Sequence, residues 1–143
     1  MFLGEYIHTT DAKGRVIIPA KFRAGLGERF FITKGFDKCL FVFPEREWRT
    51  IYDKVKELPM MDEDVIRFSR FFFGGAMEGD PDAQFRVMLA ANLRSHAQIK
   101  KEVVSVGVSS RIEIWSKENW DAYSGASNEF DAALAEKMAL LGI

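Results

Sequence analysis

The segments DAKGRVIIPAKFR (residues 11–23) and DAQFRVMLAANLR (residues 82–94) decide how this chain folds, because they are two copies of one motif. Aligned at an offset of 71 residues, they are identical at six of thirteen positions, and most other positions are apolar in both. About thirty residues later each copy reaches a short apolar segment and a Trp-containing helix start, LFVFPEREW (40–48) and RIEIWSKENW (111–120). The pattern predicts two copies of one unit, which we place at residues 1–75 and 76–143.

Within each copy the pattern predicts short strands, a polar turn, one short helix and a longer helix. Gly14 provides a residue that accepts positive φ in the turn at residues 11–14, and Pro19 suits the first position of a helix. The segment after the turn is expected to return alongside the strand before it. In the first copy we expect strands at 4–9, 15–18, 30–33 and 40–43, with the last two paired, and helices at 19–23, after Pro44 and at 63–73.

The longer helices carry apolar residues at helical spacing. Asp62 is placed to cap the helix at 63–73, and a last helix is expected after residue 127 or 128. The apolar positions are Trp48, Ile51, Tyr52, Val55 and Leu58 after Pro44, four phenylalanines at 68 and 71–73, and Phe130, Leu134, Met138 and Leu141 near the C-terminus. Four short strands cannot bury both faces alone, whereas two copies packed together would. We therefore expect an α+β fold in which short strands close into a small barrel-like core with peripheral helices.

The composition is that of a globular protein. The 143 residues are 48% hydrophobic and 29% charged, and no window approaches the ~18 uninterrupted apolar residues of a membrane helix. Glu5 and Asp11 interrupt the apolar core that a signal peptide would need, so we expect a cytoplasmic protein with no membrane partner. The net charge of −1 does not by itself indicate nucleic acid. Residues 1–40, however, hold seven Lys and Arg against four Asp and Glu, so a polyanion site is expected near the N-terminus.

Few residues suggest catalysis or metal binding. Cys39 lies in an apolar strand and is interpreted as a core cysteine, and His8 and His96 belong to no metal-binding pattern. The acidic run at 62–64 suits a helix N-terminus, and Gly74-Gly75 lacks the spacing of a phosphate loop. We expect no enzyme activity, no catalytic residue, no metal, no cofactor and no small-molecule substrate.

The turn Asp11-x-x-x-Arg15 is the one feature that suggests nucleic acid. Lys13 lies at its tip, and Lys21 and Arg23 follow on the next helical turn. A two-stranded ribbon that projects arginine and lysine fits a major groove. Phosphate repels the aspartate, so its expected role is to pair with Arg15 or to bind the N–H groups of the turn. On spacing alone, an ordinary surface ion pair across a hairpin remains the alternative.

Three segments together resemble the bacterial MraZ family of the SpoVT/AbrB-like superfamily. They are MFLGEYIHTTDAKGRVIIPAKFR (1–23), RFFFGGA (70–76) and SRIEIWSKENW (110–120). The resemblance covers nearly the whole chain and implies two tandem AbrB-like half-domains that assemble into ring-shaped homo-oligomers. It also implies a nucleoid-associated transcriptional regulator, typically a repressor. Such a regulator binds short G-rich direct repeats in double-stranded promoter DNA of its own division and cell-wall gene cluster.

The Asp-x-x-x-Arg DNA motif of the family falls on Asp11 and Arg15, with Lys13 and Gly14 on the same loop. Arg15 is our first candidate for a base contact and Lys13 the next. Lys21 and Arg23 are candidate phosphate contacts because of their charge and nearness.

The second family motif falls on Asp82 and Arg86, but here the sequence departs from the pattern. Gln84 replaces a basic tip, Phe85 stands where glycine is usual, and Ala90 replaces proline. Because phenylalanine pays a steric cost at positive φ, we expect this loop to bend differently or to be buried at a subunit contact, and to bind DNA weakly.

An interaction or antitoxin-like module without sequence-specific DNA binding is the alternative function. The apolar stripe at Phe130–Leu141 motivates it, because an amphipathic tail can bind a partner or a neighbouring subunit.

Overall fold

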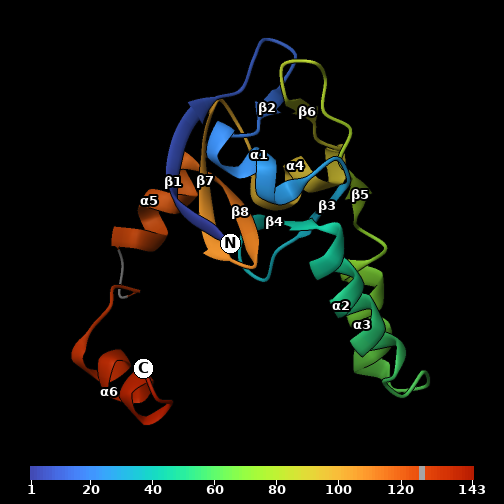
Figure 1. Cartoon of the computed structure of the whole chain (residues 1–143), viewed down its shortest axis with the longest axis vertical. Helices are drawn as coiled ribbons and strands as arrows, with labels where there is room; N and C mark the ends of the chain where they lie inside the picture. The colour runs from blue at the N-terminus through green and yellow to red at the C-terminus, as the bar shows by residue number, and fades with distance from the viewer. Residues whose placement is uncertain (126–127) are drawn as a thin grey trace.

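Two antiparallel sheets built from both halves of the chain form the body of the protein. The computed structural model describes residues 1–125 and 128–143 (Figure 1). The larger sheet has the strand order β1 (Phe2–Thr9), β7 (Glu102–Ser109), β8 (Arg111–Ser116), β4 (Cys39–Pro44), β3 (Phe30–Lys34) and β5 (Met77–Glu78). The smaller sheet pairs β2 (Arg15–Ile17) with β6 (Arg86–Met88). Each half thus contributes three strands to the large sheet and one to the small one.

The predicted return of residues 15–18 alongside the first strand is wrong. β1 pairs along its whole length with β7, and β2 pairs with β6, so both partners come from the other half. The pairing of β1 with β7 aligns eight residues, whereas β2 is only three residues long and could replace few of these contacts. The predicted hairpin of β3 and β4 is confirmed.

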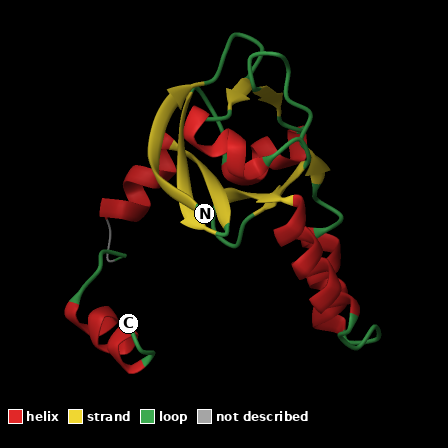
Figure 2. Ribbon diagram, in the orientation of Figure 1, coloured by secondary structure: helices red, strands yellow, loops and turns green. Residues whose placement is uncertain are grey.

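The helices lie in four places (Figure 2). Two short helices, α1 (Ala20–Leu26) and α4 (Ala91–Ala97), lie between the two sheets. The pair α2 (Glu45–Lys56) and α3 (Glu63–Phe72) projects from the body as an arm, while α5 (Lys117–Gly125) packs on β7 and β8. The last helix, α6 (Ala132–Leu140), lies apart from the sheets.

Capping residues explain where these helices begin. Pro19 and Pro44 precede α1 and α2, and α1 runs to Leu26, three residues further than predicted. The predicted cap of α3 is confirmed, because the Asp62 carboxylate accepts from the amides of residues 64 and 65. The predicted start of the last helix is wrong: the Asp131 carboxylate accepts from the amide of residue 134 at 2.8 Å, so α6 begins at Ala132. Residue 127, one of the two predicted boundaries, lies outside the described residues.

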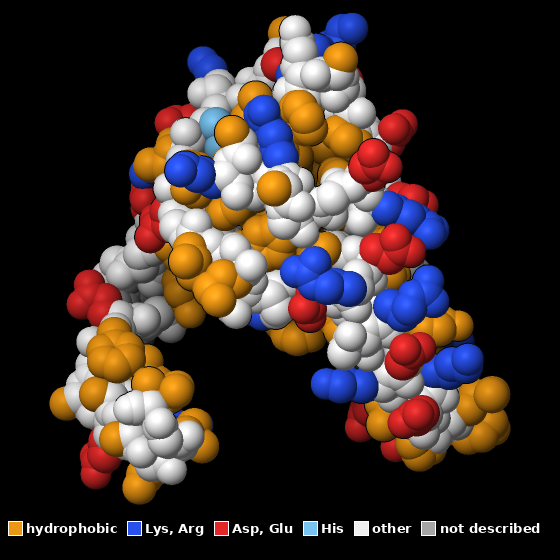
Figure 3. All heavy atoms as spheres, viewed as in Figure 1, with side chains coloured by type: hydrophobic (Ala, Val, Ile, Leu, Met, Phe, Trp, Pro, Cys, Tyr) orange, Lys and Arg blue, Asp and Glu red, His pale blue; other side chains and the backbone are white. Residues whose placement is uncertain are grey.

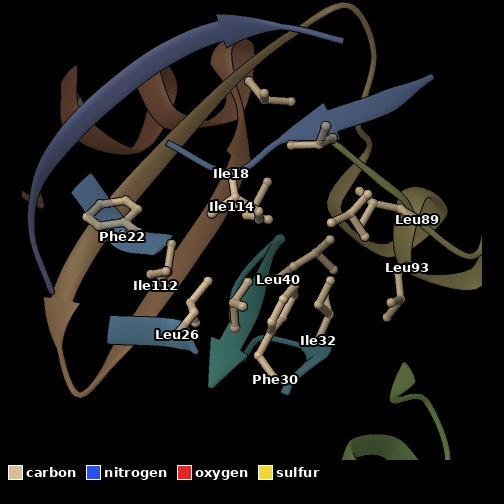
Figure 4. Close-up of a cluster of buried hydrophobic side chains, with 14 of the residues drawn as sticks. Ile18, Phe22, Leu26, Phe30, Ile32, Leu40, Leu89, Leu93, Ile112 and Ile114 are labelled. Atoms are coloured by element: carbon tan, nitrogen blue, oxygen red, sulfur yellow. The ribbon is translucent and has the colours of Figure 1, made fainter. Parts of the chain in front are cut away.

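Side chains of both repeats share the main core between the sheets. Val16 and Val87, which are equivalent in the repeat, face each other at the centre of the small sheet and are both 1% exposed. Ile18, Phe22 and Leu26 of the first half meet Leu89 and Leu93 of the second (Figure 4). Because both halves contribute side chains to this core, neither half has a core of its own.

A second apolar cluster joins the opposite face of the large sheet to the helical arm. Its buried members are Cys39, Phe41, Phe43, Phe72 and Trp115. The predicted α+β class and its tandem repeats are confirmed, whereas the boundary between residues 75 and 76 stays a prediction. No helix within the described residues has both the length and the hydrophobicity of a membrane span.

Candidate nucleic-acid interface

The loop that precedes β2 is closed by the Asp11 carboxylate. Its Oδ1 accepts from the amides of Lys13 at 3.0 Å and Arg15 at 2.9 Å, and its Oδ2 accepts from Arg15 Nε at 2.7 Å. The backbone adds two bonds, from the Asp11 amide to the Arg15 carbonyl and from the Gly14 amide to the Asp11 carbonyl. Both predicted roles of the aspartate, pairing with arginine and binding turn amides, are therefore confirmed.

The loop that precedes β6 has the same set of bonds. Asp82 Oδ1 accepts from the amides of Gln84 and Arg86, both at 2.9 Å, and Oδ2 accepts from Arg86 Nε at 2.8 Å. The two backbone bonds also recur, from the Asp82 amide to the Arg86 carbonyl and from the Phe85 amide to the Asp82 carbonyl.

The expectation that the second loop bends differently is wrong. Phe85 adopts φ of +60°, close to the +78° of Gly14. A positive φ costs a non-glycine residue about 1–2 kcal/mol, and five hydrogen bonds around Asp82 hold the loop in this shape despite that cost. Phe85 is also 42% exposed in the single chain.

The four charged residues of the two loops form one network across the repeat. Besides its own aspartate, Arg15 places Nη1 3.3 Å from Asp82 Oδ2, and Arg86 places Nη1 3.5 Å from Asp11 Oδ2. Each guanidinium thus contacts both carboxylates, and the formal charges cancel. The ordinary ion pair that spacing alone suggested is part of this larger network. Among the described residues, the contacts of each arginine side chain within this network are made by Nε and Nη1, so the N–H groups of Nη2 can donate to another acceptor.

Hydrogen bonding keeps both aspartates ionised. The Arg15 amide, with further bonds from the Arg15 side chain and the Lys13 amide, lowers the pKa of Asp11. The amides of Arg86 and Gln84 lower the pKa of Asp82 in the same way. The network therefore keeps its full set of charges at neutral pH.

Each loop is also contacted by an arginine from the short helix of the other half. Arg23 on α1 places its guanidinium 4.2 Å from the centre of the Phe85 ring and donates through Nε to the Ile18 carbonyl. Its repeat equivalent on α4, Arg94, lies beside Gly14: a Cβ added there would be 3.3 Å from Arg94 Nη1. Arg94 Nε is buried and has no hydrogen-bond partner among the described residues.

Arg94 and Phe85 are members of the site that the sequence prediction did not include. Arg94 could have been found from the sequence, because it is identical to Arg23 in the repeat alignment. The contact of Phe85 with Arg23 had no signal, because it joins residues 62 positions apart.

Both loops stand side by side at one end of the molecule (Figure 1), where Lys and Arg side chains project next to hydrophobic ones (Figure 3). Lys13 and Gln84, the two tips, are exposed, as is Lys21 on α1. Arg15 and Arg86 are less accessible, with 23% and 30% of their side chains exposed. Of the eight predicted residues, Asp11, Arg15, Asp82 and Arg86 form one network, Lys13 and Gly14 belong to the first loop, and Arg23 contacts Phe85 of the second. Lys21 is an exposed residue of α1.

The cysteine and the histidines that were considered for catalysis or metal binding are buried or hydrogen-bonded within the fold. Cys39 is buried as predicted, and burial raises the pKa of its thiol to about 12, so it is protonated at neutral pH. His8 Nε2 lies 2.9 Å from Ser105 Oγ, and burial lowers its pKa. His96 Nε2 donates to the carbonyls of residues 35 and 37. Within residues 1–125 and 128–143, no three His, Cys, Asp or Glu side chains cluster as a metal site requires.

Comparisons with known proteins agree with this repeat architecture. A family model described as "MraZ protein, putative antitoxin-like" matches twice, at residues 1–71 and 72–141. A protein of Acetivibrio thermocellus named "Transcriptional regulator MraZ" is 52% identical over 143 residues, which is 100% of both chains. A protein of Carboxydothermus hydrogenoformans with the same name is 54% identical over 138 residues, 96% of each chain. A third, from Thermoanaerobacter pseudethanolicus, is 52% identical over the full length of both chains. On this evidence, the chain belongs to the MraZ family.

Proposed function

We propose that this protein is a sequence-specific DNA-binding transcriptional regulator that uses the paired loops at residues 11–15 and 82–86. The observation that carries the proposal is the shared geometry of these loops, which project side by side from one end of the molecule. A two-stranded ribbon with projecting tips fits the width of a major groove. The names of the relatives support the same function.

The charged residues of the site fall into two groups, one that positions the loops and one that attracts DNA phosphates. The network of Asp11, Arg15, Asp82 and Arg86 is neutral and fixes the loops. Attraction to phosphate then comes from the lysines and arginines around it, namely Lys13, Lys21, Arg23 and Arg94. The free N–H groups of Arg15 and Arg86 suit the O6 and N7 acceptors of guanine.

A ring of subunits, which presents the same loops several times, would give the protein sufficient affinity for DNA. Two or three phosphate contacts per loop give little affinity at physiological salt. When several subunits bind repeated DNA sites at once, effective concentration raises the affinity by about 10²–10⁴. G-rich direct repeats in the promoter of its own division and cell-wall gene cluster are the target we propose, with repression as the outcome. The protein would then act in the cytoplasm, at the nucleoid.

Two apolar surfaces of the single chain support self-association. The arm carries a groove of about 700 Å³ whose lining includes Trp48, Tyr52, Leu58, Met60 and Phe73. The C-terminal segment exposes Phe130, Leu134, Leu140 and Leu141. A nine-residue helix such as α6 is marginal alone, and burying this apolar surface against a second copy would stabilise it.

Fluorescence anisotropy with a labelled duplex of several TGGG repeats tests the proposal. Lys13→Ala should weaken binding at every duplex and lower the salt slope by about 1, because one phosphate contact is lost. Lys54→Ala, which removes an exposed lysine from the arm, is the matched control.

Arg15→Ala and Arg86→Ala should each reduce binding to the repeats at least tenfold, because each arginine supports both loops. Thermal melts show whether the variants remain folded. Wild-type affinity in Lys13→Ala and Arg15→Ala, or equal binding of wild type to a scrambled duplex, would refute the proposed mode.

An interaction module is the second candidate, favoured by the exposed apolar residues of the C-terminal segment. Deletion of residues 128–143 separates the two. If the deletion abolishes both assembly and DNA affinity, the result supports the regulator. If assembly and DNA affinity are unchanged, the segment is available to bind another protein, as an interaction module requires.

A further inference from the structure

We propose that the second loop is a distinct base-recognition element, in which Gln84 and Phe85 bind an A·T pair next to guanines bound at the first loop. The inference rests on the proposed function and concerns the specificity of the same site. The two loops differ at their tips. The first tip is Lys13-Gly14 and the second is Gln84-Phe85, on backbones held by equivalent hydrogen bonds.

The second tip is displayed as openly as the first. Gln84 is exposed and uses only its backbone amide in the loop, since no side-chain hydrogen bond of Gln84 occurs among the described residues. Its amide oxygen and nitrogen are therefore free to bind a ligand. The glutamine amide can donate to N7 and accept from N6 of adenine at once, which lysine cannot do.

Phe85 supplies the apolar part of the same element. Arg23 covers one side of its ring at 4.2 Å, and the residue is 42% exposed at positive φ. The exposed part of this aromatic ring matches the C5-methyl group of thymine, which lies on the same edge of an A·T pair. Gln84 and Phe85 together thus present one group for each base of that pair.

The register of the small sheet sets the offset between Arg15 and Arg86, the arginines that end the two loops. Ile17 lies opposite Arg86 in the small sheet, two residues beyond Arg15. Two residues of strand span about 7 Å, which is close to two base-pair steps of 3.4 Å. Arg15, which follows the first tip, suits guanine, and the second tip suits the A·T pair.

The test is a panel of duplexes in which each pair flanking the guanine run is changed, one at a time, between A·T and G·C. Anisotropy with wild-type protein should show about a tenfold loss when one particular A·T pair becomes G·C. Gln84→Ala should abolish the preference at that pair while guanine preferences stay. Gln84→Lys should reverse it, because lysine binds O6 and N7 of guanine.

Phe85→Leu and Phe85→Gly distinguish the apolar contact from the turn conformation. Leucine keeps an apolar contact to the thymine methyl, and glycine removes it, so only glycine should reduce the A·T preference strongly. An unchanged base preference in Gln84→Ala and Gln84→Lys would overturn the inference while leaving the proposed function intact. Failure of wild type to bind any duplex would instead overturn both.

Discussion

The loops at residues 11–15 and 82–86 share five hydrogen bonds and differ in the residue at the left-handed position of the turn. Gly14 fills it in one loop and Phe85 in the other, with φ of +78° and +60°. The comparison shows that the Asp-x-x-x-Arg spacing sets the shape of the turn. Glycine makes that shape easier to form but is not required for it.

Contacts from the other half compensate for phenylalanine at this position. The Arg23 guanidinium packs on the Phe85 ring, and the Phe85 carbonyl accepts from the Ile18 amide at 2.8 Å. A cation–π contact at a partly exposed site contributes about 0.5–1 kcal/mol, which offsets part of the cost of positive φ. At the first loop, Arg94 approaches a glycine, which has no ring that the guanidinium could pack on.

The largest expected effect tests whether the two halves are equivalent at the centre of the small sheet. Val16→Ala and Val87→Ala should each destabilise the protein by about 2 kcal/mol, because both side chains are 1% exposed and each loses two methyl groups from the shared core. Urea unfolding measures the change. A difference of more than ~1 kcal/mol between the variants would contradict equal burial of the two strands.

A smaller and unequal effect is expected from exchanging the two tip residues. Gly14→Phe should destabilise by about 1–2 kcal/mol, since it imposes a positive φ on phenylalanine and places Cβ 3.3 Å from Arg94 Nη1. Phe85→Gly should change stability by less than ~1 kcal/mol. It relieves the strain but loses the contact with Arg23 and adds chain entropy to the unfolded state.

Urea unfolding of both tip variants and of Phe85→Leu makes this test. Equal destabilisation by Gly14→Phe and Phe85→Gly would contradict this expectation. It would show that each turn depends on its own residue at the left-handed position and that the two turns are not equivalent in shape.

The smallest expected effect comes from the charges of the two aspartates, and it appears in how stability depends on pH. Both aspartates have a pKa below their ordinary value of 3.8, so the unfolded chain binds protons first. Their stabilising contribution is complete above about pH 4 and is lost as the pH falls through the lower folded pKa. Asp11→Asn and Asp82→Asn should each flatten the fall in melting temperature between pH 5 and pH 2, and by similar amounts. An acid profile unchanged from wild type in either variant would show that its loop does not depend on the charge.

The sequence predicted most of the local structure. Strand and helix positions, the turn closed by Asp11, the Asp62 cap and buried Cys39 all follow from short-range patterns that neighbouring residues determine. The repeat of residues 11–23 at 82–94 also predicted two structurally related halves, because similar sequences have similar local preferences.

Only the tertiary structure decided how the halves combine. Each strand had an equivalent in the other copy, so the sequence could not distinguish pairing within a half from the observed pairing of β1 with β7 and β2 with β6. The joining of the two Asp–Arg pairs and the packing of Arg23 on Phe85 depend on that exchange. Local propensity acts over a few residues, whereas these contacts span more than sixty positions. They form because burying Val16 against Val87 brings both loops to the same end of the molecule.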